Sequence, residues 1–494
     1  MTTPSAAALP TAAPAACSRR QFLARAGFAL GGLAVASLPV AAGNALERTR
    51  SPRRILIVGA GLSGLVAGYE LRRAGHEVTI LEATSRSGGR VRTLRDPFSD
   101  GLYAEAGAGR IPNTHRITLA YIKQFGLRLA PYRPTRTATI YSAGRQRVRV
   151  EPGHAPDLAA LDAGFSPEEV RLGLDGIYAR HLAPLSHEIG TVPPEQWPSA
   201  AVRRYGNETL AERLTQQGAS PVAIRQLALG YEADSVLDFL RDAYSHEAPR
   251  LFHVVGGNDL FPRAFATRLA DVIQYGAPVV RIEQDDREVR AVVEGPGRSG
   301  TFTADRLICG VPFAALRHVA FAPALSPGKA AAIAELPYGS VTRVYLQSHR
   351  RYWLDEGADG FAQPLDLPME LWNPSHDQPG RRGLQLGYLY EALARQVAAL
   401  DEAERIRFFL DLVEPMYPSV RRHFELGASF SWTAQPYQRG AYAVYGKGDY
   451  DRHGPHVRTP EGRLHFCGEH ASPWPGWMQG ALYSGLRAAR EATA

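Results

Sequence analysis

Cysteine is scarce in this sequence. Among its 494 residues there are three, Cys17, Cys309 and Cys467. No CxxC pair and no metal-ligand spacing accompanies them, so the sequence predicts neither a disulfide framework nor a metal site. Cys309 and Cys467 lie in the apolar, strand-like runs RLICGVP and LHFCGEH. Cysteine in such a run is usually a buried free thiol, and we expect this state for both residues.

Concentrated charge is absent as well. The chain has 56 lysines and arginines against 49 acids, a formal net charge of +7, and no basic block stands out. This pattern argues against nucleic acid and against a charged membrane surface as partners. With 45% hydrophobic residues the composition is that of a soluble globular protein, and 494 residues exceed one ordinary core. We therefore expect two or three subdomains.

Residues 1–45 are typical of an export segment rather than of folded structure. Arg19 and Arg20 stand in S-R-R-Q-F-L, ahead of an apolar run from about residue 28 to 40 and small residues suited to cleavage. The arginine pair resembles a twin-arginine signal, which exports folded, cofactor-loaded proteins. The apolar run is short for a membrane span and rich in Gly and Ala. We expect export to the periplasm or medium, loss of Cys17 with the signal, and no stable membrane anchor.

A dinucleotide-binding unit is predicted directly after this segment, in RRILIVGAGLSGLVAGYELRRAGHEVTILEA. The apolar run 55–58 suits a strand buried on both faces, and an amphipathic helix follows to about Ala74. A second strand, EVTILE, ends at Glu82, whose carboxylate is placed to bind a ribose diol.

The turn between the first strand and the helix carries Gly59, Gly61 and Gly64 in a G-x-G-x-x-G pattern. The first glycine allows a tight turn, the second lets the backbone meet a pyrophosphate, and the third lets helix and strand pack closely. The helix N-terminus would then face the phosphates with the positive end of its dipole.

The continuation ATSRSGGRVRTL resembles the flavin amine oxidase family, in which the arginine of G-G-R, here Arg90, approaches the FAD pyrophosphate. The closing segment LHFCGEHASPWPGWMQGALYSGLRAARE is similar to the family's last strand, loop and helix. There, Glu469 would reach the ribityl or ribose side, and the helix after Gly476-Trp477 would point at the isoalloxazine. VVGGNDLFPRAFATRLADVIQYGAPVVRIEQ resembles a third FAD stretch, with Val279 near the adenine.

The resemblance covers roughly residues 53–494, with few motifs in 130–245, and implies FAD as the cofactor. The implied FAD contacts are Gly59, Gly61, Leu62, Ser63, Gly64, Glu82, Ala83, Arg90, Gly107, Ala108, Gly109, Arg110, Val279, Glu469, Trp477 and Met478.

The implied fold class is α/β. It comprises a Rossmann-type, glutathione-reductase-like FAD domain, a mixed-sheet substrate domain and a helical insertion. The FAD domain would be assembled from residues 53–115, 250–330 and 440–494. The helical insertion would cover 125–245, and the substrate domain 331–439, with VTRVYLQS and LQLGYLY as strands.

The stretch AGAGRIPNTHRITLAYIKQFGLRL resembles the L-amino acid oxidases of the snake-venom type. In those enzymes the matching arginine, here Arg110, clamps the substrate α-carboxylate with its planar guanidinium. A structural salt bridge is the alternative role for Arg110. The resemblance also implies a carboxylate contact for Tyr388, with Tyr390 as runner-up, or core packing for either ring. At Gly476-Trp477 a backbone carbonyl would receive the ammonium and the indole would form a wall.

Three positions depart from family patterns. Where monoamine oxidases carry a flavin-linking cysteine this chain has Ala441, so FAD should bind noncovalently. The lysine that many members use near flavin N5 is replaced by Arg343, which keeps the charge but changes reach and geometry. Asp242 stands where the snake-venom type has a histidine near the substrate side chain. If Asp242 faces the pocket rather than the surface, it favours basic side chains over large apolar ones, with Glu391 as a second acid.

The sequence therefore favours an exported FAD-dependent L-amino acid oxidase. It would use O2 and release 2-oxo acid, ammonia and H2O2, and no dedicated side-chain base is evident. A monoamine or polyamine oxidase on the same fold is one alternative, although an arginine clamp would be idle there. An amino acid monooxygenase and a flavin-containing binding protein without turnover are the others. The sequence also allows a homo-oligomer.

Overall fold

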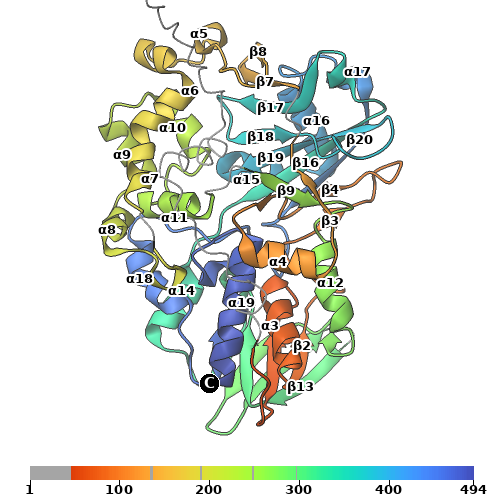
Figure 1. Ribbon diagram of the computed structural model, residues 1–494, viewed down its shortest axis with the longest axis vertical. Helices are drawn as coiled ribbons and strands as arrows, with labels where there is room; N and C mark the ends of the chain where they lie inside the picture. The colour runs from red at the N-terminus through yellow and green to blue at the C-terminus, as the bar shows by residue number, and fades with distance from the viewer. Residues whose placement is uncertain (1–45, 134–136, 190–191, 247–249, 296–297) are drawn as a thin grey trace, which may run out of the picture.

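The computed structural model describes residues 46–133, 137–189, 192–246, 250–295 and 298–494. The predicted export signal and Cys17 lie outside the described residues. In Figure 1 the sheet that includes residues 54–58 and 77–81 occupies the lower half of the molecule, a second large sheet the upper right, and a group of helices the upper left.

The lower sheet has five strands, all parallel. β1 (Arg54–Val58) lies between β2 (Glu77–Leu81) and β14 (Arg306–Cys309). β10 (Ile273–Gln274) and β21 (Leu464–Phe466) complete the order β10-β2-β1-β14-β21. The strands come from three separate stretches of the chain. β1 lies near the start of the described chain and β21 near its end, so both ends of the chain contribute to this one sheet.

The first strand is buried on both faces, as its continuous apolar run predicts. Ile55 and Ile57 face one core cluster with helix side chains, whereas Leu56 and Val58 face another on the opposite side. Four helices are associated with the first cluster: α3 (Leu62–Arg73), α4 (Arg116–Gln124), α12 (Leu260–Arg268) and α19 (Met478–Thr493). α3 packs along α19, and the two lie side by side in Figure 1.

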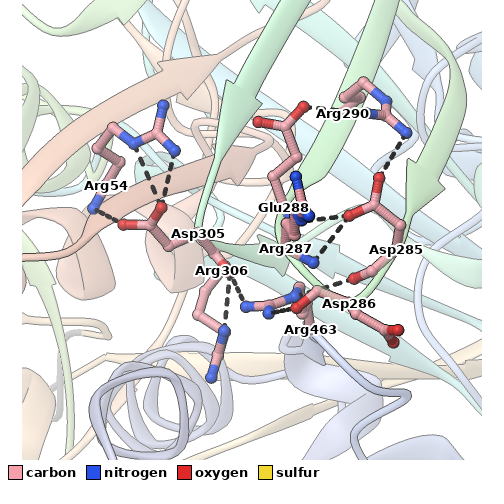
Figure 2. A network of polar contacts seen from close by, with 9 residues as sticks. All are labelled: Arg54, Asp285, Asp286, Arg287, Glu288, Arg290, Asp305, Arg306 and Arg463. Atoms are coloured by element: carbon pink, nitrogen blue, oxygen red, sulfur yellow. Dashed lines mark hydrogen bonds and ion pairs between the residues drawn. The ribbon is translucent and has the colours of Figure 1, made fainter.

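A smaller sheet caps the other face of the parallel sheet. Its order is β13 (Arg298–Ala304), β12 (Val289–Gly295), β11 (Val279–Gln284) and β15 (Ala320–Ala322). Hydrogen bonds from Arg463, the residue before β21, tie its β11–β12 turn to the parallel sheet (Figure 2).

In that network Asp305 accepts from the backbone N–H and guanidinium of Arg54, at 2.8 Å each, while Arg463 donates to the backbone carbonyls of Asp285, Asp286 and Asp305. Backbone N–H groups of the turn, together with Arg290, hold the pKa of Asp285 at about 2.

The upper sheet has seven mostly antiparallel strands. From one edge they are β20 (Phe424–Ser431), β16 (Val341–Ser348), β19 (Gly383–Tyr390), β18 (Met369–Trp372), β17 (Ala358–Pro364), β7 (Ala138–Ala143) and β8 (Gln146–Val150). β16 coincides with the predicted strand VTRVYLQS, and β19 contains LQLGYLY. β17 pairs with β7 in parallel, which makes the sheet mixed.

The stretch 125–245, expected to be helical, is only partly so. It supplies β6 (Leu129–Pro131) and the hairpin β7–β8, which extends the seven-stranded sheet. β6 joins β5 (Ile111–Pro112) and β9 (Leu251–Val254) in a three-stranded sheet. The helices of this stretch are α5 (Leu158–Leu161), α6 (Pro167–His181), α7 (Ala183–His187), α8 (Ala200–Arg203), α9 (Leu210–Gln216), α10 (Pro221–Ala228) and α11 (Val236–His246).

The remaining elements connect these layers. They are β3 (Thr93–Leu94), β4 (Ala104–Glu105), α13 (Phe313–Leu316), α14 (Pro327–Glu335), α15 (Glu391–Ala398), α16 (Glu402–Val413), α17 (Val420–His423), α18 (Asp449–Val457) and four short 3-10 turns. Cys309 and Cys467 are buried free thiols, as predicted. Among the helices of the described ranges, none is long and apolar enough to cross a membrane.

Candidate active site

A cavity of about 500 Å³ extends from the carboxyl ends of β1 and β2 to the seven-stranded sheet. Nineteen of the twenty residues predicted to form the site line it. They are Gly59, Gly61, Leu62, Ser63, Glu82, Ala83, Arg90, Gly107, Ala108, Gly109, Arg110, Asp242, Val279, Arg343, Tyr388, Glu469, Gly476, Trp477 and Met478. The exception is Gly64, which lies behind the cavity wall.

The glycine turn has the shape that a pyrophosphate requires. A Cβ at Gly64 would stand 2.0 Å from the Gly59 carbonyl oxygen, so only glycine lets α3 begin this close to β1. A Cβ at Gly61 would meet no atom within 4 Å, because the backbone there borders open space. Gly61 caps α3 without a side-chain hydrogen bond, which leaves the N–H groups of the first turn for an anion.

Glu82 lies at the end of β2 with its carboxylate fixed. Oε2 accepts a hydrogen bond from the Ala60 N–H at 2.8 Å, and Oε1 accepts from the N–H and hydroxyl of Thr84 at 2.9 and 2.7 Å. The side chain is buried and lines the cavity. A carboxylate oriented in this way can accept further hydrogen bonds from a diol.

Arg90 and Glu469 join two distant parts of the wall. Arg90 Nη1 donates to Glu469 Oε1 at 2.7 Å, and Glu469 Oε2 accepts from the Gly476 N–H at 2.9 Å. Burial by itself would raise the pKa of Glu469, but Arg90, His470 and the Gly476 N–H together hold it below its usual value. The G-G-R loop thereby fixes the loop that precedes α19.

The segment AEAGAGR is held by backbone contacts on both sides. A Cβ at Gly107 would meet the Arg90 carbonyl oxygen at 1.9 Å, so this position requires glycine. The Ala106 carbonyl accepts from Trp432 Nε1 at 2.7 Å, and the Ala108 carbonyl accepts from the Asn258 amide at 2.8 Å. The backbone that precedes Arg110 is therefore fixed before any ligand binds.

Arg110 extends into an aromatic environment. Its guanidinium carbon lies 4.6 Å from the centroid of the Trp372 ring and 5.8 Å from that of Tyr132, and its side chain is 9% exposed. Its acidic partner is Glu370, with Arg110 Nη1 3.5 Å from Glu370 Oε2. Glu370 is a contact of Arg110 that sequence reasoning missed. The signal that could have indicated a buried ion pair was an acid within the apolar strand MELW.

Tyr388 and Arg343 face each other from neighbouring strands. They are paired in the register of β19 and β16, and the Arg343 guanidinium carbon lies 4.5 Å from the Tyr388 ring centroid. Arg343 is buried and donates from Nη1 to the Glu105 carbonyl at 2.6 Å. Tyr390, the alternative to Tyr388, is absent from the lining of the main cavity and donates to Glu370 at 3.2 Å.

Glu105 is a half-buried acid beneath this wall. It accepts from the Asn258 N–H at 2.7 Å and from the Thr93 hydroxyl at 3.0 Å. Burial raises the pKa of Glu105 to about 7, although these two hydrogen bonds oppose the shift.

The start of α19 closes the cavity. The helix begins at Met478, directly after Gly476-Trp477, as the sequence predicts. The Trp477 ring meets the His115 ring edge to face at 5.0 Å, and this contact fixes the indole against the cavity.

Asp242, on α11, lines the main cavity and also a side pocket of about 40 Å³. The side pocket further contains Asp234, Asp238 and Tyr390. Glu391, expected as a second acid beside Asp242, lines neither space. Its carboxylate accepts instead from the Ser340 N–H at 2.8 Å and from Arg395 at 2.7 Å.

The second acid beside Asp242 is Asp238 rather than Glu391. Asp238 lies on the same helix as Asp242 and lines the same side pocket. It forms a 2.5 Å ion pair with Arg241.

A family model and two relatives resemble this sequence over most of its length. A family model described as flavin containing amine oxidoreductase matches residues 62–493. Over 468 residues the chain is 36% identical to "Putative L-amino-acid oxidase YobN" of Bacillus subtilis (strain 168), covering 91% of this chain and 96% of that protein. Over 462 residues it is 29% identical to the L-amino-acid oxidase BmooLAAO-I of Bothrops moojeni, covering 91% of each.

Solved structures resemble the fold. Cyclohexylamine oxidase from Brevibacterium oxydans IH-35A superposes with a TM-score of 0.76 at 23% identity, and wild-type putrescine oxidase bound to putrescine with 0.77 at 21%. Each comparison covers 90% of this chain and 99% of the other. At these identities the likeness concerns the fold.

Proposed function

This chain belongs to the family of flavin-containing amine oxidoreductases, as its motifs predict, and FAD is its cofactor; from this premise we propose that it is an FAD-dependent L-amino acid oxidase. The reaction converts an L-amino acid, O2 and water into a 2-oxo acid, ammonia and H2O2. The relatives named L-amino-acid oxidase that support the proposal span nearly the whole chain.

One observation carries the proposal: the guanidinium of Arg110 lines the same cavity as the dinucleotide turn. A permanent cation that is 9% exposed among aromatic rings needs an anion to offset its desolvation. Glu370 provides one at 3.5 Å, a long contact that engages a single nitrogen. A planar guanidinium suits a two-pronged contact with a carboxylate, and an α-carboxylate distinguishes amino acids from simple amines.

The residues for FAD follow from the fit of the glycine turn. We infer a Rossmann-type arrangement, in which Gly61 and the first turn of α3 hold the pyrophosphate, Glu82 a ribose, and the Val279 backbone the adenine. When bound, FAD supplies the two-electron acceptor for substrate oxidation and passes the electrons to O2.

The substrate would be held at both ends of its amino acid moiety. Arg110 and the Tyr388 hydroxyl bind the carboxylate, the Gly476 carbonyl receives the amine, and the Trp477 indole forms the wall. Fixing both polar groups orients the Cα–H and turns the encounter into a step within one complex. The buried aromatic wall favours the neutral amine over the ammonium, which is the form that can be oxidised.

Arg343 would assist the oxygen half of the reaction. Its guanidinium is fixed by the Glu105 carbonyl and by the Tyr388 ring, so its positive charge requires little reorganisation. A preorganised cation stabilises negative charge as it develops during O2 reduction.

Asp242 would select the side chain. A carboxylate that lines both the main cavity and the side pocket favours the cationic end of L-arginine or L-lysine, because opposite charges attract strongly where little water screens them. Asp238 is already paired with Arg241 at 2.5 Å and so adds less attraction.

We also propose that the protein is exported through its twin-arginine-type segment. Twin-arginine export carries folded proteins, which suits a cofactor that must be bound before the chain leaves the cytoplasm. Replacing Arg19 and Arg20 by lysine should leave FAD-containing protein in the cytoplasmic fraction. Unchanged export would contradict this assignment.

An anaerobic screen tests the function. The FAD-loaded protein is mixed without oxygen with L-amino acids and with amines that have the same side chains but no carboxylate. Bleaching of the flavin band by amino acids supports the proposal, and bleaching by amines instead indicates an amine oxidase. Repeating the active cases in air distinguishes a 2-oxo acid with H2O2 from the amide that a monooxygenase would form. A flavin that no compound bleaches contradicts enzymatic oxidation.

A further inference from the structure

A cluster of metal-ligating side chains lies outside the active-site cavity. His253, His376 and Asp377 each offer one ligand atom, and these atoms all lie within 4.8 Å of one another. His253 Nε2 and Asp377 Oδ2 are 2.9 Å apart, and the two imidazole rings have centroids 5.9 Å apart at 73°. None of the three residues lines the cavity described above.

The cluster joins two segments that are far apart in sequence. His253 is on β9, the central strand of the three-stranded sheet, and is paired there with Ala130. His376 and Asp377 lie in the loop that connects β18 to β19. Pairing with β6 at His253 and with β5 at the neighbouring Phe252 holds the backbone that carries this ligand without an ion.

The loop is fixed as well. The side chain of Gln378 donates to the carbonyls of Tyr103 and Pro374 at 2.7 and 2.8 Å, and it accepts from the Tyr103 N–H at 3.0 Å. His376 has a hydrogen-bond partner in the backbone of Tyr132. A backbone partner on one ring nitrogen orients an imidazole so that its other nitrogen is available to a metal.

We propose that His253, His376 and Asp377 bind one Zn²⁺ per chain, with water completing the coordination. Two imidazoles and one carboxylate are a donor set that zinc accepts in proteins, typically with water at the remaining position. Oxygen-seeking cations such as Ca²⁺ and Mg²⁺ prefer sites without imidazole. The ion would take the place of the hydrogen bond between His253 and Asp377, with small movements of the three side chains.

A positively charged side chain, Arg351, lies close enough to oppose the ion. Arg351 interacts electrostatically with Asp377 and His376. Its guanidinium, however, donates to the backbone carbonyls of Gln378 and Arg382, at 2.5 and 3.2 Å, rather than to Asp377. The Asp377 carboxylate therefore stays oriented toward the imidazole of His253.

The site would support the wall behind Arg110. On β9, Phe252 is paired with Ile111, which follows Arg110, and with Pro131. Pro131 precedes Tyr132, whose ring lies 5.8 Å from the Arg110 guanidinium. The expected role is therefore structural: the ion would cross-link this wall without contacting substrate. Zinc binding is measured without turnover, so its outcome is independent of the proposed oxidase activity.

The test uses the full FAD-loaded chain without a histidine tag, stripped with a chelator and desalted. Zn²⁺ is titrated in competition with a chromophoric chelator at pH 7.5, and Tm is followed by scanning fluorimetry. We expect one Zn²⁺ per chain and a higher Tm with Zn²⁺, but no rise with Ca²⁺ or Mg²⁺. Less than about 0.2 Zn²⁺ per chain at micromolar free zinc, or an equal rise with Mg²⁺, would overturn the proposal.

Variants locate the ion. His376→Ala and Asp377→Asn should each weaken Zn²⁺ binding at least about tenfold. His349→Ala is the matched control, because it removes an exposed imidazole that contacts a second histidine, His423, and no third ligand joins this pair within the described part of the chain. Asp377 is partly exposed, so Asp377→Asn remains informative if His376→Ala fails to retain FAD. Unchanged affinity in Asp377→Asn, or loss in His349→Ala, would place the zinc elsewhere.

Discussion

Replacing Arg110 by lysine tests the carboxylate clamp most directly. The substitution keeps the positive charge beside Trp372 and Glu370 but removes the planar fork. The 4.6 Å stacking on Trp372 and the nearly complete burial of Arg110 indicate that lysine would fit the same space. Its ammonium, a compact point charge, would engage the substrate carboxylate with one hydrogen bond instead of two.

The expected loss follows from that difference. A hydrogen bond to a charged group contributes about 1.5–3 kcal/mol. Because about 1.4 kcal/mol corresponds to a factor of ten, kcat/KM should fall by about one to two orders of magnitude. FAD content should not change, since the contacts that hold the glycine turn do not involve Arg110.

Steady-state H2O2 production with the best L-amino acid measures this loss, with FAD content read from the visible spectrum. The amine that corresponds to the same substrate serves as an internal reference, because it has no carboxylate to lose. Arg92→Lys is the matched control: Arg92 stacks on Phe430 at 4.7 Å but does not line the cavity. An unchanged kcat/KM in Arg110→Lys, or an equal fall in Arg92→Lys, would remove Arg110 from the substrate site.

Four further predictions concern the cofactor, the side chain and pH. Acid precipitation should release all flavin into the supernatant, because Ala441 offers no thiol for a covalent link; flavin in the pellet would contradict this. Asp242→Asn should lower kcat/KM for L-arginine or L-lysine far more than for L-phenylalanine, and equal losses would exclude Asp242 from side-chain selection. Burial raises the pKa of Glu105 from 4.5 to about 7, so the folded state holds a proton that the unfolded chain releases. The contribution of this bound proton to the free energy of unfolding is fully present below about pH 4.5 and is lost as the pH rises through about 7. Tm should therefore fall between about pH 4.5 and 7, and Glu105→Gln should make this fall smaller. Burial lowers the pKa of Lys329 from 10.5 to about 7, so stability should rise with pH above 7, and a Lys329→Met variant that keeps this rise would contradict the assignment.

Local patterns predicted the positions of the first two strands of the parallel sheet and of the helix between them. The strand at 55–58, the helix that follows and the second strand correspond to β1, α3 and β2 within about a residue at most boundaries. Each of these elements is specified by its own residues, through a continuous apolar run, glycines at a fixed spacing and an amphipathic period. The position of Gly64 against the Gly59 carbonyl follows from the same local geometry.

Long-range pairing could not be predicted in the same way. The hairpin β7–β8 lies in a stretch that was expected to be helical, yet it extends the seven-stranded sheet because β7 pairs in parallel with β17, more than 200 residues later. Glu391 and Asp238 show the same limit. Sequence spacing placed Glu391 near Tyr388, whereas the fold turns its carboxylate to Arg395 and places Asp238 in the side pocket.

The relation between the two possible roles of Arg110, a clamp and a salt bridge, could not be predicted from the sequence. The local sequence allows either role, and the structure contains the partner for a salt bridge, Glu370. That carboxylate is held more closely by other donors, Trp372 Nε1 at 2.8 Å and the Tyr390 hydroxyl at 3.2 Å, than by Arg110 at 3.5 Å. A guanidinium has five N–H donors, and this contact engages one of them. Glu370 can therefore compensate the buried charge of Arg110 and still leave donors for the proposed substrate carboxylate, so the salt bridge does not exclude the proposed clamp.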